Sequence, residues 1–145
     1  MELDDHTYSE IAKLADDGNK ASDAGEFDRA VESYRKGLDL LPKPLEIWEA
    51  ATWLFAGIGD AYFLSGKMES ALPPLLGAMH CPGAISNPFL HLRLGQVQFE
   101  LGNPARAADE LTRAYMGEGT TIFEGEDPKY FEFLKTKIKE PPEGW

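Results

Sequence analysis

The stretch GNKASDAGEFDRAVESYRKG, residues 18–37, decides the fold because its pattern of small residues recurs twice further along the chain. Its first glycine returns 41 and then 36 residues later, and four further columns move by the same two offsets. The five columns are Gly18, Gly59 and Gly95; Gly25, Gly66 and Gly102; Ala30, Ala71 and Ala107; Tyr34, Leu75 and Leu111; and Gly37, Ala78 and Ala114. Such self-similarity predicts one structural unit that is repeated three times.

The spacing within a unit predicts two helices joined by a tight turn. The first glycine and the alanine are small residues that allow two helices to cross closely. The second glycine falls just past the first helix, where a positive φ ends it. Apolar residues then recur three and four positions apart, as in a helix; in the first unit they are Phe27, Ala30, Val31, Tyr34 and Leu38.

This pattern resembles the tetratricopeptide repeat family, whose 34-residue unit is a helix-turn-helix. The resemblance covers roughly residues 8–116 and implies an all-α fold, with three tetratricopeptide hairpins in a short right-handed α-solenoid. We expect a single domain over residues 1–145, with units at about 8–42, 45–82 and 87–116. Asp127 and Pro128 are typical of an N-cap and a first helical residue, so we predict a C-terminal capping helix at about 127–139.

Three segments depart from the regular pattern. The offset of 41 exceeds the family period by seven residues, and we expect residues 44–51 to lengthen the first helix of the second unit. Pro73 and Pro74 fall inside the expected second helix of that unit, where proline removes a donor. We therefore expect this helix to begin late, with Ser70 near its N-cap, or to be kinked. Residues 117–119 are expected to be a flexible link.

The charge and the composition limit the possible partners and the compartment. Acidic side chains outnumber basic ones by 25 to 14, and a net charge of −11 argues against nucleic acid and anionic membranes as partners. It suits a basic protein partner, or solubility alone. Residues 1–6 lack the features of a secretion signal, and the single Cys81 does not indicate an oxidising compartment. We expect a cytoplasmic monomer or weak dimer with no membrane partner.

The residues that commonly carry catalysis are dispersed. The histidines lie far apart, at His6, His80 and His91, and none has another histidine or a cysteine three or four positions away. Cys81 follows His80, but sequence neighbours do not face each other as a nucleophile and its base. The glycines are explained by the repeat, and acidic pairs such as 126–127 are typical of caps or solvated faces. We therefore predict a protein that is not an enzyme and has no cofactor or metal.

In the tetratricopeptide family the first helices of the units line a groove that binds a protein ligand. Carried over position by position, the resemblance implies a set of groove residues in each unit, which we call the groove columns. They are Asn19 and Ser22, with Ala15, in the first unit; Trp53, Asp60 and Phe63, with Ala56, in the second; and Phe89, Arg93, Gln96 and Glu100, with Phe99, in the third. Some family members clamp a C-terminal carboxylate with two lysines, two asparagines and one arginine. Only Asn19 and Arg93 match this clamp, since Ala15, Gly57 and Phe89 replace the other three, so clamp activity is not expected.

A closer resemblance is to small bacterial tetratricopeptide proteins found with toxins, on residues 48–53, 87–93, 114–117, 126–130 and 141–142. This resemblance implies a non-enzymatic protein-binding module, most specifically an immunity-type protein that binds and neutralises a bacterial toxin. A basic toxin domain would suit the acidic charge. Two alternatives stay open: a secretion chaperone that holds an exported protein in its groove, and a generic scaffold or adaptor.

Overall fold

The computed structural model of the protein describes residues 2–145, which divide into two compact units, one ending at Ala84 and one beginning at Ile85. Residues 2–145 contain helices and turns and no strand, which confirms the predicted all-α class. Met1, part of the segment judged to lack a secretion signal, lies outside the described residues. A single domain over residues 1–145 stays a prediction.

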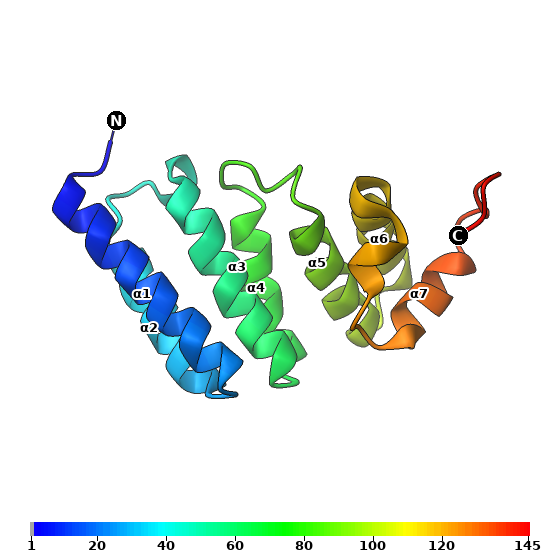
Figure 1. The fold of residues 1–145 in the computed structure, drawn as a ribbon, viewed down its shortest axis with the longest axis horizontal. Coiled ribbons are helices and arrows are strands. Elements are labelled where there is room, and N and C mark those ends of the chain that lie inside the picture. The colour runs from blue at the N-terminus through cyan, green and yellow to red at the C-terminus, as the bar shows by residue number, and fades with distance from the viewer. Residues whose placement is uncertain (1) are drawn as a thin grey trace. The chain divides into compact units, whose positions relative to one another are not determined.

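The first unit consists of two helical hairpins, which lie side by side in Figure 1. One hairpin pairs α1 (Asp5–Asp23) with α2 (Phe27–Leu40), and the other pairs α3 (Glu49–Leu64) with α4 (Met68–Ala78). Helix α3 contacts both α2 and α1. These contacts bury one apolar core that the two hairpins share.

The second unit contains the third hairpin, α5 (Pro88–Glu100) with α6 (Pro104–Glu118). A short 3₁₀ helix, η2 (Gly119–Phe123), then leads to α7 (Pro128–Lys135). The predicted flexible link at 117–119 is wrong, because α6 continues through Glu118 and η2 follows directly. The three predicted hairpins and the C-terminal helix are thus all present.

Every hairpin turns at the second glycine column, as predicted. Gly25, Gly66 and Gly102 have φ values of 77°, 80° and 81°, a left-handed conformation that glycine adopts without steric cost. The next residue then donates its N–H back to the last turn of the first helix, as Glu26 does to the Ala21 carbonyl at 2.8 Å. The turn therefore satisfies the carbonyl groups that the helix end leaves open.

The first glycine column is where the two helices of each hairpin touch. A Cβ atom added to Gly18 would lie 2.5 Å from the Tyr34 ring, and one added to Gly95 would lie 2.7 Å from the Leu111 side chain. Gly59 lies equally close to Leu75. The partner is in each case the residue 16 positions later, so the repeated spacing encodes a repeated contact.

The extra residues of the second unit do not lengthen its first helix. Leu45–Ile47 instead form a separate 3₁₀ turn, η1, and Trp48 has an extended backbone that ends it before α3 begins at Glu49. The buried Trp48 indole donates its Nε1–H to the Pro42 carbonyl at 2.6 Å. The Trp48 side chain thus ties the turn to the end of the first hairpin, which prevents helix continuation.

The prediction of a late start for α4 is also wrong. This helix begins at Met68 with Lys67 as its N-cap, and both Pro73 and Pro74 lie inside it. Each proline removes the N–H that would bond to the carbonyl four residues earlier, at Glu69 and Ser70. Both of those residues are exposed, so water can hydrate their carbonyl groups and the helix tolerates the two prolines.

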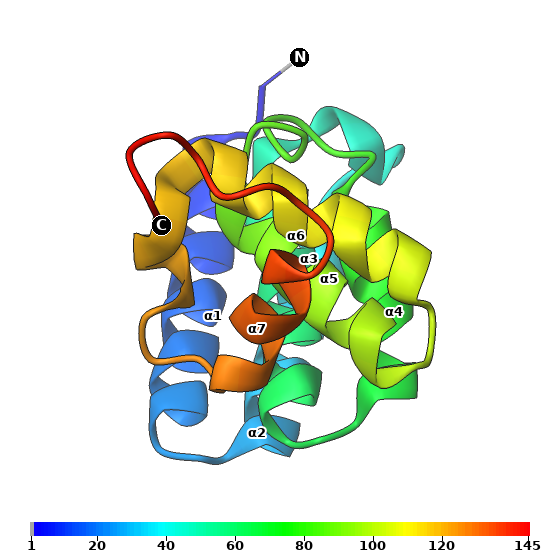
Figure 2. The ribbon, with the colours of Figure 1, turned by 90° about the vertical axis from the view of Figure 1, so that its right-hand side faces the viewer.

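The C-terminal helix ends four residues before its predicted limit of 139. The Thr136 hydroxyl donates to the Phe133 carbonyl at 2.7 Å, and the Thr136 N–H bonds to the same carbonyl at 3.0 Å. Such local bonds compete with the regular helical ladder. Figure 2 shows the tail beyond α7 running back over α6, and the Trp145 ring contacts Tyr115 of α6, at 5.9 Å between ring centroids.

We predict that Tyr34→Ala will lower the free energy of unfolding by about 3–5 kcal/mol, because the substitution empties a space that the surrounding backbone is shaped to hold. The Tyr34 ring lies between Gly18 and Gly57, and an added Cβ on Gly57 would lie 2.6 Å from it. Urea unfolding followed by circular dichroism measures the change. Tyr8→Ala is the control, since Tyr8 is 51% exposed and its loss should cost no more than about 0.5 kcal/mol.

Candidate functional site

The predicted groove columns fall on three helices in two units. Asn19 and Ser22 lie on α1, and Trp53, Asp60 and Phe63 lie on α3, all in the first unit. The remaining columns, which are Phe89, Arg93, Gln96 and Glu100, lie on α5 in the second unit. The two sets differ in what surrounds their polar groups.

In the first unit two of the columns, Asn19 and Asp60, lie near the hydroxyl of Tyr34. The ring passes between α1 and α3 at Gly18 and Gly57, and the hydroxyl donates to Oδ1 of Asn19 at 2.5 Å. Burial of the ring, with the nearby Asp60 and Asp23 carboxylates, raises the pKa of Tyr34 to about 12. The structure therefore brings Asn19 and Asp60 together and adds Asp23, which the sequence analysis missed.

An aromatic stripe on α3 accompanies this acidic group. Trp53 is 41% exposed, and Phe63 is half-buried. Trp53, Asp60 and Phe63 are spaced seven and three residues apart, which places them on one face of the helix. Asp23 could have been inferred from its position four residues after Asn19 on the same helix. We call Asn19, Asp23, Trp53, Asp60 and Phe63 the first-unit surface.

In the second unit the polar columns are bound to the chain itself. The Arg93 guanidinium donates through Nη1 to Oε1 of Glu126 at 2.6 Å and to Gln96 at 2.8 Å. Gln96 also donates to the same Glu126 oxygen, at 2.7 Å. The Phe89 ring lies 5.0 Å from the guanidinium carbon, which adds a cation–π contact. These columns are therefore occupied by a residue from the loop before α7.

Glu100 is held in the same way by the first turn of α7. Its Oε1 accepts from Lys129 Nζ at 2.7 Å and from the Tyr130 hydroxyl at 3.0 Å. Burial and this hydrogen bond to a carboxylate raise the pKa of Tyr130. Phe99 packs edge-on against the Tyr130 and Phe133 rings. The sequence analysis missed these partners, because Glu126, Lys129 and Tyr130 lie some 30 residues away and share no repeat spacing with α5.

Two of the residues considered for catalysis, His91 and Cys81, have structural roles in the folded chain. His91 is buried, with Nδ1 2.6 Å from Glu110 and Nε2 2.7 Å from the Ile85 carbonyl. Burial raises the pKa of the Cys81 thiol, which disfavours the nucleophilic thiolate. Within residues 2–145 no group of three or more histidine, cysteine or acidic side chains could hold a metal ion.

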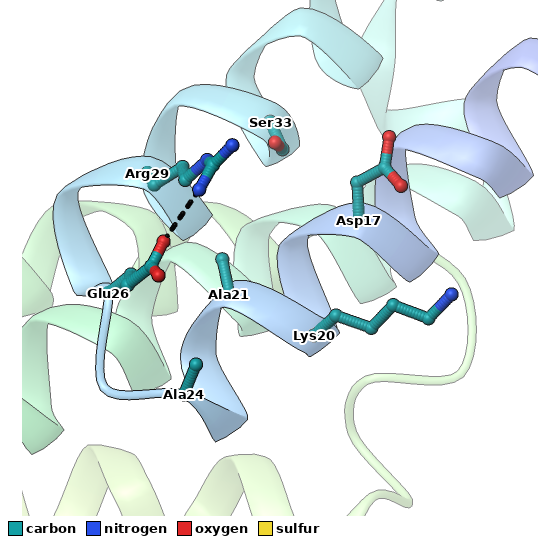
Figure 3. Close-up of a pocket in the computed structure, with 7 residues that line it drawn as sticks. All are labelled: Asp17, Lys20, Ala21, Ala24, Glu26, Arg29 and Ser33. Atoms are coloured by element: carbon teal, nitrogen blue, oxygen red, sulfur yellow. Dashed lines mark hydrogen bonds and ion pairs between the residues drawn. The ribbon is translucent and has the colours of Figure 1, made fainter.

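A shallow hollow of about 450 Å³ lies on the first hairpin (Figure 3). Its lining residues are Asp17, Lys20, Ala21, Ala24, Glu26, Arg29 and Ser33. Arg29 donates to Glu26 at 2.8 Å, and Lys20 pairs with Asp16 at 3.0 Å. These exposed ion pairs are typical of a solvated surface, so the hollow offers no convergent groups for a ligand.

Solved structures of tetratricopeptide domains are similar to this chain. The first such domain of Spaghetti (RPAP3), bound to the HSP90 peptide SRMEEVD, is 22% identical, with a TM-score of 0.67 over 88% of this chain and 92% of that one. The Arabidopsis OM64 domain is 18% identical, with a TM-score of 0.70 over 91% and 99%. The second domain of human RPAP3, in complex with the HSP70 peptide SGPTIEEVD, is 22% identical, with a TM-score of 0.66 over 93% and 99%.

These likenesses show that the chain has a tetratricopeptide fold, as the repeat columns predicted. No family model and no curated protein matches the sequence. In the part of the chain that the structure describes, no helix combines the length and the apolar character needed to cross a membrane.

We predict that the protein loses stability between pH 10 and pH 12, in part because Tyr34 resists ionisation in the folded state. Its pKa is about 12 when folded and 10.0 ordinarily, so its contribution is complete below pH 10 and is lost as the pH rises toward 12. Urea unfolding at the two ends of this range should show a smaller loss for Tyr34→Phe, which cannot ionise. Tyr8→Phe is the control and should lose as much stability as the parent; equal losses in all three proteins would contradict the assignment.

Proposed function

We propose that this chain is a non-enzymatic protein-binding module and that its first-unit surface contacts the partner. The observation that carries the proposal is an exposed Trp53 in line with Asp60 and Phe63 on one face of α3. Half-exposed aromatic side chains beside polar groups are typical of the residues that dominate binding energy in protein interfaces. Two similar structures hold peptides of HSP90 and HSP70, so the fold is used for protein recognition elsewhere.

The charges of the first-unit surface favour a basic partner over an acidic peptide. Asp23 and Asp60 both act on the Tyr34 hydroxyl, and the whole chain carries a net charge of −11. An acidic peptide would meet repulsion there, whereas a lysine- or arginine-rich segment would be attracted over a long range. The positions of the carboxylate clamp also argue against an acidic peptide, since Ala15 and Gly57 supply no positive charge.

The most specific form of the proposal is an immunity-type protein that binds and neutralises a basic domain of a bacterial toxin in the cytoplasm. It is supported by the sequence resemblance and by the acidic surface. In this form the protein acts as a monomer or weak dimer and has no nucleic acid or membrane partner. A secretion chaperone and a general scaffold are the alternatives, and they differ in partner: an extended exported segment, or a component of a larger complex.

We predict that Trp53→Ala will weaken partner binding by about 2 kcal/mol or more, mainly through faster dissociation. The partner is first captured with the parent chain from its native organism and identified by mass spectrometry. Purified partner is then measured against both proteins by surface plasmon resonance. The matched control is Leu76→Ala on α4, because Leu76 is 40% exposed but lies outside the groove columns. Equal affinity of Trp53→Ala and Leu76→Ala for the partner would show that Trp53 on α3 does not contribute to the interface.

Asp60→Asn and a protection assay separate the finer alternatives. If the partner is basic, the neutralised variant should associate more slowly and with a weaker dependence on salt. In the immunity form, co-expression of the parent should protect cells from the toxin and the Trp53→Ala variant should not. Competition by a short peptide of the partner would instead indicate the chaperone form.

A further inference from the structure

A hollow of about 350 Å³ in the first unit lies between α2 and α4, and α3 forms its floor. We call it the α4 hollow. At 3.6 residues per turn, Phe55 and Tyr62 project from the side of α3 roughly opposite to Trp53 and Asp60 of the first-unit surface. The α4 hollow is therefore separate from the proposed partner surface. Its walls include Arg35 and Leu38 of α2, and Ser70, Pro73 and Pro74 of α4.

The floor of the α4 hollow is an apolar layer that the core leaves partly exposed. Leu38, Phe55 and Tyr62 pack against the buried core, and each is half-buried. The Phe55 ring rests on Gly77 of α4, where an added Cβ would lie 3.3 Å from it. Because these side chains are already ordered, an apolar side chain that covers them gains hydrophobic free energy and orders few further groups on the protein.

One cation stands at the edge of this floor. Within residues 2–145, Arg35 is the one charged residue that lines the α4 hollow, and its guanidinium pairs with no carboxylate. Its Nη2 donates to the Tyr62 hydroxyl at 3.1 Å, which uses one of five N–H donors. The neighbouring cations are already paired, Lys36 with Glu32 at 3.2 Å and Lys67 with Asp28 at 3.5 Å. Arg35 therefore keeps donors for a carboxylate from outside the chain.

The opposite wall supplies a hydrogen-bond acceptor. Pro73 and Pro74 deprive the carbonyl groups of Glu69 and Ser70 of their helical donors. Of these two residues, Ser70 lines the α4 hollow and is exposed. A backbone N–H of a bound segment can take the place of water on the Ser70 carbonyl. The hollow thus offers a donor on one wall, an acceptor on the other and an apolar floor between them.

We propose that the α4 hollow binds an extended segment of a partner protein in which an apolar side chain and an acidic side chain stand two residues apart. Side chains at this spacing point to the same side of an extended chain. The apolar side chain covers Leu38 and Phe55, the carboxylate accepts from Arg35, and a backbone N–H donates to the Ser70 carbonyl. The α4 hollow is thus a second interaction surface, with a preference of charge opposite to that of the first-unit surface.

The test is an NMR titration of the ¹⁵N-labelled, full-length protein with the peptide acetyl-Ser-Phe-Ser-Glu-Ser-amide. Binding should shift the amide signals of the hollow, and Arg35→Gln should weaken it about ten-fold or more, because a hydrogen bond to a charged group is lost. Arg29→Gln is the matched control and should bind as the parent does. Arg29 is also an exposed arginine of α2, but it pairs with Glu26 and does not line the α4 hollow.

A pair of proline variants tests the acceptor. Pro74→Ala restores the N–H that bonds to the Ser70 carbonyl, so it should weaken peptide binding about three-fold although it favours the helix. Pro73→Ala loses a similar ring but restores the bond to the Glu69 carbonyl, which is not part of the lining, and should bind more tightly than Pro74→Ala.

Peptide variants test the stated chemistry. A peptide with glutamine in place of its glutamate, and one with phenylalanine and glutamate adjacent, should both bind about ten-fold more weakly than the original peptide. Two results would overturn the proposal: no binding to the parent at peptide concentrations up to about 5 mM, or equal affinities of Arg35→Gln and Arg29→Gln. Tighter binding of a peptide with lysine in place of glutamate would overturn it as well, because the hollow would then favour a cation.

Discussion

In each hairpin a glycine of the first helix lies against a large side chain of the second, and the other contacts of the hairpin depend on this approach. The pairs are Gly18 with Tyr34, Gly59 with Leu75, and Gly95 with Leu111. A Cβ on any of these glycines would overlap its partner, so the two helices could not keep this separation. At this distance the neighbouring alanines, Ala30, Ala71 and Ala107, are completely buried, and the apolar faces close over them.

In the first hairpin this contact between glycine and a large side chain also involves a third helix. Tyr34 is larger than Leu75 and Leu111, and its ring also reaches Gly57, so one side chain joins α2 to both α1 and α3. Its hydroxyl emerges where α1 and α3 meet and is held by Asn19. A packing residue thereby sets the position of the polar part of the first-unit surface, so the hairpin contact and the proposed binding surface share one ring.

The two units are built from the same hairpin but differ in the charged groups near their groove columns. In the first unit burial of the ring, together with the nearby Asp60 and Asp23 carboxylates, raises the pKa of Tyr34. In the second unit the groove columns contain a buried cation, Arg93, and the chain neutralises it with its own Glu126. Glu100 is likewise taken up by Lys129. The C-terminal segment thus contributes more than apolar contacts to the third hairpin, because it also forms ion pairs with that hairpin's charged side chains.

The sequence by itself determined the three hairpins and their turns, because these follow from spacings within about 20 residues. It also gave the N-cap at Asp127 correctly, since a cap is a local hydrogen bond. Only the tertiary structure decided that Trp48 breaks the helix before α3 and that Glu126 fills the position at Arg93. Those contacts join residues that no periodic pattern relates, and their distances depend on how whole helices pack rather than on the residues between them.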